Sequence, residues 1–210
     1  MNTRSLIAFG AGAIAATSLT LLIAAGPEHD AKKNPHQPDA MQEMGPAEMM
    51  AAMAEMATPG EQHEQLMKTC GQWEAKGSFV MDPAAPPMQS TGSMTIEPAM
   101  GGRFVKCDFK MDFMGQPFSG LSYAGYDKYH DQYVTVWMDT MSTKITYMEG
   151  NHNDDGDLVM KGISSTPMGD NPMKIVTTHH DDDHFTDHFY DQMPDGTWVN
   201  TGTIKYTRRD

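Results

Sequence analysis

Hydrophobic and polar residues alternate with a period of two along most of the chain after residue 71. The clearest case is segment 103–113, where Val105, Cys107, Phe109 and Met111 lie on one face and Lys and Asp residues fill the other. Such alternation is typical of an antiparallel strand with one buried and one solvated face. Turn-forming residues recur at intervals of roughly 8–12 residues, as in all-β barrels and sandwiches.

The alternation predicts about ten strands. Their ranges are 72–81, 89–97, 103–113, 117–126, 132–139, 143–150, 157–164, 173–180, 184–192 and 197–208. Short strands in immediate succession favour an up-and-down meander, and closure of that meander removes the exposed sheet edges. We therefore predict an all-β fold, a single antiparallel up-and-down β-barrel preceded by short helices.

The residues before the strands divide into three segments of different character. Residues 1–25 combine a basic start with a long uncharged apolar run at 6–25, which predicts an export signal peptide or an uncleaved N-terminal membrane anchor. Residues 26–45 are polar and proline-containing and are expected to form a disordered linker, and 46–69 a short methionine-rich helical segment. The barrel domain is then expected at 70–210. The protein is thus predicted to be exported, periplasmic or secreted, and to contact a membrane only through the N-terminal segment if that segment is uncleaved.

The chain is acidic, with 15 Lys and Arg residues against 28 Asp and Glu residues and a net charge of −13. A field of this sign repels phosphate backbones, so no nucleic-acid partner is expected. The two cysteines, Cys70 and Cys107, are too few for a cysteine-rich zinc site. In an exported protein they could form a disulfide, but we favour two buried free thiols.

Two segments carry side chains that bind metals in other proteins. His180, His184 and His188 would share a face only on a helix, whereas the surrounding residues favour a strand hairpin with an acidic turn. The methionine-rich segment could hold Cu(I) through thioethers, or simply present a flexible apolar helix face, which we favour. The three histidines remain weak metal candidates, and no metal or cofactor is predicted.

Several segments of the chain resemble DUF1579, a bacterial family of uncharacterised proteins, over about residues 60–208. The similar segments are Leu66–Glu74, Met81–Pro83, Pro86–Met88, Gly101–Phe104, Met114–Phe118, Gly125–Asp127, Trp137–Asp139 and Tyr206–Arg209. The resemblance implies a barrel like those of lipocalins and fatty-acid-binding proteins. Gly71 and Trp73 also resemble the first-strand signature of the wider calycin group, which implies that Trp73 plugs one barrel end beneath Arg208 or Arg209. The family has no established activity, so the resemblance implies no catalytic residue.

The mixed inward face of such a barrel favours binding of a small apolar or amphipathic molecule. The pocket candidates are Phe109, Met111, Tyr126, Thr135, Trp137 and Tyr206. The same side chains could instead fill a solid core, and both interpretations stay open at this point.

Two other functions remain as alternatives to simple ligand binding. The first is a barrel-borne enzyme, an isomerase or hydrolase acting on a lipophilic substrate. It would need an inward carboxylate or histidine with a perturbed pKa, and Asp139, Glu97 and His188 are the candidates. The second is an envelope protein that handles metals through its methionines or histidines.

Overall fold

The computed structural model describes residues 45–80, 84–167 and 169–209. The predicted signal or anchor at 1–25, and the predicted linker at 26–45 except for Gly45, lie outside these described residues. Within the described residues the chain begins with two helices, α1 (Pro46–Ala57) and α2 (Glu61–Lys68). No helix in these ranges is both long enough and apolar enough to cross a bilayer.

Ten strands follow the helices, with a single 3-10 turn, η1 (Met100–Gly102), between the second and third. The strands are β1 (Gly71–Phe79), β2 (Met88–Ala99), β3 (Phe104–Phe113), β4 (Gln116–Asp127), β5 (Gln132–Asp139), β6 (Thr146–His152), β7 (Leu158–Thr166), β8 (Gly169–Asp181), β9 (His184–Gln192) and β10 (Trp198–Arg208).

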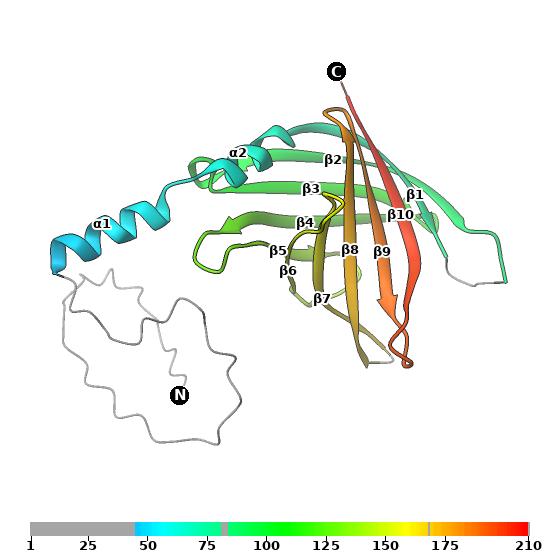
Figure 1. Cartoon of the computed structure of the whole chain (residues 1–210). Coiled ribbons are helices and arrows are strands. Elements are labelled where there is room, and N and C mark those ends of the chain that lie inside the picture. The colour runs from blue at the N-terminus through cyan, green and yellow to red at the C-terminus, as the bar shows by residue number, and fades with distance from the viewer. Residues whose placement is uncertain (1–44, 81–83, 168, 210) are drawn as a thin grey trace, which may run out of the picture. The chain divides into compact units, whose positions relative to one another are not determined.

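Each strand pairs antiparallel with the next along the chain, and β1 also pairs with β10, which closes the sheet into a barrel (Figure 1). The closing register places Trp73 of β1 opposite Arg208 of β10 and opposite Met94 of β2. This architecture confirms the fold class predicted from the alternation: a closed antiparallel meander of ten strands with short helices before it.

Most strand ends lie within two residues of the predicted ranges, but β6 and β8 begin three or more residues away. β8 begins at Gly169, so Pro172 lies inside the strand and not in the predicted turn. Proline has no backbone N–H to donate to a neighbouring strand. The pairing of β8 with β9 begins at Met173, so Pro172 pairs with only one strand, through Ile163 of β7. β6 begins only at Thr146, because the Asp139 carboxylate accepts hydrogen bonds from the amides of residues 141 and 142 and holds a loop there.

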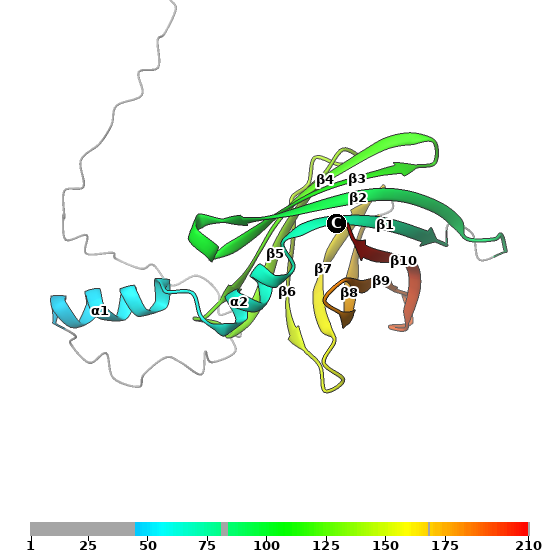
Figure 2. The same cartoon turned by 90° about the horizontal axis from the view of Figure 1, so that it is seen from above.

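Helix α2 packs against the barrel near the start of β1 (Figure 2). His63 is buried in this contact, and its ring meets the ring of Tyr126 edge-on at 6.0 Å. The Tyr133 hydroxyl donates a hydrogen bond to the Gln65 side chain at 3.4 Å, and Leu66 packs on hydrophobic clusters from both sides of the barrel. The helix therefore covers the barrel end at which β1 begins, which we call the α2 end.

Helix α1 has no buried residue. Its four methionines, Met49, Met50, Met53 and Met56, are between 46% and 67% exposed. The end of the helix is bonded to the β4–β5 turn, where the Lys128 ammonium donates to the carbonyls of Glu55 and Thr58 at 2.9 and 3.2 Å. The helix thus adds no side chain to the barrel core.

We expect the domain boundary to lie between the two helices. Deletion of residues 1–60 should change the free energy of unfolding of the barrel by less than about 1 kcal/mol, since only surface contacts are lost. Deletion of residues 1–69 is the matched control and also removes Leu66 and His63, which should cost at least about 2–3 kcal/mol. Urea unfolding followed by circular dichroism measures both. An unfolded 61–210 fragment would place α1 in the folding unit and contradict the boundary.

Candidate functional site

The strand register determines which side chains point into the barrel, because directly opposed residues in an antiparallel ladder lie on the same face. The buried Ala75 of β1 opposes Tyr206, which opposes Phe185, and the inward set can be followed from strand to strand around the barrel. Around the middle of the barrel it comprises Cys107, Phe109, Ser122, Thr135, Trp137, Met148, Met160, Ile175, Thr177, Phe185, Asp187 and Tyr206.

The buried inward side chains form two hydrophobic clusters and not one continuous core. The larger cluster is centred on Trp73, Phe109 and Tyr206 and is built from β1–β3, β9 and β10. The smaller contains Tyr133, Met148 and Met160, on β5–β7. Leu66 of α2 packs against both clusters. A solid domain of this size ordinarily has one contiguous core, so the separation indicates that the two barrel walls are not in contact throughout.

The inward side chains of β8 are also less completely buried than those of β1. In β1, the inward Trp73 and Ala75 are buried and the outward Gln72 and Lys76 are exposed. In β8, every residue from 173 to 178 is half-buried, whichever face it occupies. The inward face of β8 is therefore not packed against a dry core, unlike that of β1.

Asp187 of β9 places a carboxylate beside this face, opposite Thr177 of β8 and Ile204 of β10. Its oxygen accepts a hydrogen bond from the Thr177 hydroxyl at 2.6 Å and another from the Tyr206 hydroxyl. Burial raises the pKa of the Asp187 carboxyl to about 6, although both hydrogen bonds act in the opposite direction. Burial, followed by the Asp187 charge, raises the pKa of Tyr206 well above its usual range, so this phenol remains a hydrogen-bond donor at neutral pH.

The thiol of Cys107, on β3, also faces the barrel interior and interacts electrostatically with Asp187. Burial raises the pKa of Cys107 to about 11, opposed by a hydrogen bond with Ser122, and the Asp187 charge contributes in the same direction as burial. Burial also raises the pKa of Cys70, and both cysteines are free thiols in the structure. Thiols with raised pKa values are poor nucleophiles at neutral pH, so the arrangement does not favour thiolate chemistry.

At the α2 end, an arginine and an indole join the first and last strands. The guanidinium carbon of Arg208 lies 4.2 Å from the centre of the Trp73 ring. The same guanidinium donates to the carbonyls of Lys68, Cys70 and Asp182 at 2.8–3.1 Å. A Cβ on Gly71 would approach the Arg208 Nη1 atom to 2.5 Å, and the φ of Gly71 is +143°, so both space and backbone require glycine there. Arg209 is exposed and bonds to Gln72 only through its backbone amide.

The structure distributes the predicted pocket residues between the two clusters. Phe109 and Met111 are buried in the larger cluster, where Trp137 contacts Phe109 at 6.2 Å between ring centres. The Trp137 ring occupies space that a Cβ on Gly120 would fill. Tyr126 packs on the smaller cluster, near α2, and its hydroxyl bonds to Asp131.

The remaining two predicted pocket residues lie in the inward set between these groups. Thr135 is half-buried and opposes Met148 of the smaller cluster. Tyr206 is buried in the larger cluster, where its ring stacks on Phe185 at 4.3 Å.

The three histidine candidates for a metal do not converge. His180 hydrogen-bonds Thr186, His184 bonds the Asp181 carboxylate at 2.8 Å, and His188 bonds Thr203. Among the described residues, no group of three or more His, Cys, Asp or Glu side chains could hold a metal ion. The described histidines and acids thus offer no preformed metal site.

Sequence reasoning missed Asp187 and chose other groups for a perturbed carboxylate or histidine. Asp139 accepts a hydrogen bond from the Trp137 indole and binds the following loop, Glu97 is exposed, and His188 lies on the outward face. A signal for Asp187 was nevertheless present. It sits between Phe185 and Phe189 in a period-two strand, so an acid shares the face of two phenylalanines.

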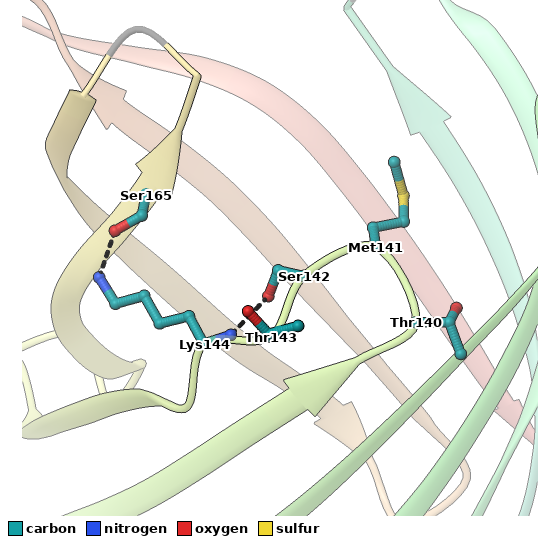
Figure 3. Close-up of a pocket in the computed structure, with 6 residues that line it drawn as sticks. All are labelled: Thr140, Met141, Ser142, Thr143, Lys144 and Ser165. Atoms are coloured by element: carbon teal, nitrogen blue, oxygen red, sulfur yellow. Dashed lines mark hydrogen bonds between the residues drawn. The ribbon is translucent and has the colours of Figure 1, made fainter.

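A concavity lies at the end of the barrel opposite α2. It is a shallow depression of about 500 Å³, lined by residues 140–144 and Ser165 (Figure 3). Its main contact is the Lys144 ammonium, which donates to the Ser165 hydroxyl at 2.6 Å and so ties the β5–β6 loop to β7. It contains no aromatic side chain and no inward carboxylate, and we regard it as a loop contact rather than a ligand site.

A family model described as "Protein of unknown function (DUF1579)" matches residues 58–208. The chain therefore belongs to the DUF1579 family, as its sequence motifs predicted. A search of curated proteins gives no match.

Two solved structures are similar to this chain at low sequence identity. The crystal structure of Rv2717c from M. tuberculosis is 12% identical, with a TM-score of 0.51 over 73% of this chain and 100% of the other. The S-type phycobiliprotein lyase CPES from Guillardia theta is 10% identical, with a TM-score of 0.49 over 72% of this chain and 98% of the other. At such identities the likeness to Rv2717c shows the fold alone.

We predict that the Trp73–Arg208 contact is a main stabilising contact of the α2 end. Trp73→Ala should lower the free energy of unfolding by about 3–5 kcal/mol, since it empties a buried indole site. Arg208→Ala should cost about 2–3 kcal/mol, because it removes the cation–π contact and leaves several carbonyls without a donor. Arg209→Ala is the matched control and should stay within about 0.5 kcal/mol. Equal effects of the two arginine variants in urea unfolding would contradict this assignment.

We also predict a pH-dependent stability from Asp187. Its folded pKa, about 6, exceeds the ordinary value of 3.8. Between about pH 4 and 6 the folded state thus binds more protons than the unfolded state, and stability falls as pH rises. Asp187→Asn should therefore be more stable than the parent by on the order of 2 kcal/mol at pH 7, with the difference vanishing below pH 4. Urea unfolding across this range measures the gap. Asp154→Asn, in an exposed turn, is the control, and a pH-independent gap for Asp187→Asn would contradict the prediction.

Proposed function

We propose that the protein binds one small, partly apolar molecule inside the barrel. The observation that carries the proposal is the half-buried inward face of β8 between two separate hydrophobic clusters. An inward face that is neither dry nor freely exposed is suited to cover an apolar ligand. A ten-stranded barrel is also wider than a tightly filled eight-stranded one.

The walls supply the contacts that such a ligand needs. Phe109, Trp137 and Phe189 present aromatic surface on the larger cluster, and Ile175 and Met160 present aliphatic surface on the smaller. Asp187, Thr177 and Tyr206 form a small polar group among these side chains. A mostly apolar wall with few polar groups is the usual composition of a small-molecule site.

We further propose that this binding takes place outside the cytoplasm. The support is the apolar run at 6–25 behind a basic start, which has the layout of an export signal or membrane anchor. Fractionation of cells from the native host, with N-terminal sequencing of the mature protein, tests both export and cleavage.

The Asp187 carboxyl favours one alternative function, an acid–base enzyme such as an isomerase or hydrolase. A pKa of about 6 is close to neutrality, where a general base is most effective. In such an enzyme the general base would be Asp187, in place of the sequence candidates Asp139, Glu97 and His188. Incubation with lipophilic esters and enones would detect it as turnover that Asp187→Asn reduces by at least about 100-fold.

The binding proposal predicts a specific effect of filling the interior. N-phenyl-1-naphthylamine should bind the parent protein with one-to-one stoichiometry. Thr135→Trp should abolish this binding and leave the melting temperature nearly unchanged, because the added ring enters open space. Val136→Trp, the next residue on the outward face of β5, is the control and should retain binding.

A solid barrel would give the opposite pattern. The parent would then bind no probe, and Thr135→Trp would cost about 1–3 kcal/mol of stability by overpacking. Native mass spectrometry of protein purified from its own host provides an independent test, since a retained small molecule would appear as a single added mass.

A further inference from the structure

The charges inside the barrel are almost all of one sign. Every lysine on a described strand occupies an outward position; these residues are Lys76, Lys106, Lys110, Lys161, Lys174 and Lys205. Three acids, Asp139, Asp187 and Asp191, occupy inward positions. The interior potential is therefore negative at neutral pH, in keeping with the net charge of −13.

The only inward arginine on the described strands is not available to a ligand. The Arg208 guanidinium lies over Trp73 and donates to three backbone carbonyls, and it pairs with the Asp183 carboxylate at 3.1 Å. An anionic ligand such as a fatty acid would therefore find no free cation on the described inward positions. It would instead meet the carboxylate of Asp187.

Asp187 lacks a charged partner in the part of the chain that the structure describes. Its neighbours there are two neutral donors, the hydroxyls of Thr177 and Tyr206. A carboxylate has about four acceptor positions, so these two bonds leave capacity for further donors. The two other inward acids differ, since Asp139 binds Trp137 and its own loop, and Asp191 accepts from Asn171. Of the three inward acids, Asp187 also lies nearest the α2 end of the barrel.

We propose that the ligand of the barrel is an amphipathic cation, whose apolar body contacts the inward aromatic and methionine side chains and whose basic nitrogen binds the Asp187 carboxylate. This inference rests on the proposed binding function and specifies the chemical class of its ligand. A charge-assisted hydrogen bond from an ammonium to a carboxylate is stronger than one between neutral groups, and more so away from bulk water. It would also supply the countercharge that Asp187 lacks.

Three twelve-carbon molecules test the proposal, because they share one apolar chain and differ only in the charge of the head group. Dodecylamine, dodecanol and dodecanoate should displace N-phenyl-1-naphthylamine from the parent protein at pH 7.5 in that order of strength. The amine should act at least about tenfold more strongly than the alcohol, and the carboxylate more weakly than either. Asp187→Asn should reduce the preference for the amine over the alcohol to less than about twofold. Asp154→Asn makes the same charge change in an exposed turn and should keep the preference.

The pH provides a second readout. Lowering the pH from 7.5 to 5 should weaken the preference for dodecylamine more in the parent than in Asp187→Asn, because Asp187 becomes protonated across this range. The other titratable groups on the inward face around it are Tyr206, Cys107, Asp191, His152 and His179. Tyr206 and Cys107 stay protonated throughout, and burial lowers the pKa of His179, which gains positive charge only toward the acidic end.

The outcomes separate this inference from the function on which it rests. If the probe binds but the three head groups compete equally, or if Asp187→Asn keeps the amine preference, the cation proposal is wrong and interior binding stands. If neither the probe nor any of the three chains binds by fluorescence or calorimetry, the binding function itself is wrong.

Discussion

The structure depends on the closure of its sheet between the first and last strands. A meander of ten strands would otherwise end in two free edges, each with unpaired backbone groups. The β1–β10 pairing removes both edges, and the Arg208 side chain strengthens it by reaching three carbonyls that belong to other segments. Its stacking on Trp73 fixes the register at the same point. Closure also turns one face of every strand inward, so the interior exists only because these ends meet.

The two sides of the barrel differ in how completely they fill that interior. Near the closing strands, Trp73, Phe185 and Tyr206 form a chain of ring contacts at 4.3–4.8 Å, and the inward face of β1 is buried. On the opposite side, the smaller cluster has three buried members and β8 has none. The side with the larger cluster can hold the barrel together, while the other side buries its inward side chains less completely. This division is the basis for proposing that the closed barrel holds a ligand in its interior.

Much of this fold follows from the sequence, because period-two alternation and turn chemistry are local properties. Segment 103–113 alone shows which face of β3 is apolar, and Gly71 with Trp73 indicates the α2 end. The separation of the core into two clusters does not follow, since it depends on the width of the closed barrel and on which rings reach across it. Asp187 was missed for a different reason. His188 was a candidate for an inward group, but it lies on the outward face of β9, whereas Asp187 shares the inward face with two phenylalanines.

The ionised Asp187 carboxylate lowers the stability of the folded barrel at neutral pH, which raises the question of what the group is for. Burial of a carboxyl opposes its ionisation, and here two hydrogen bonds only partly offset the effect, since the pKa stays near 6. An asparagine or a leucine at this position would avoid that cost. Thr177 and Tyr206 nevertheless orient their hydroxyls toward the carboxylate from both neighbouring strands, so the group is supported and not merely tolerated. This supported charge has no countercharge on the described strands and lies between the half-buried β8 and the larger cluster, where the proposed cationic ligand would neutralise it. Such a ligand would need both a positive head and enough apolar surface to displace water from the walls around it.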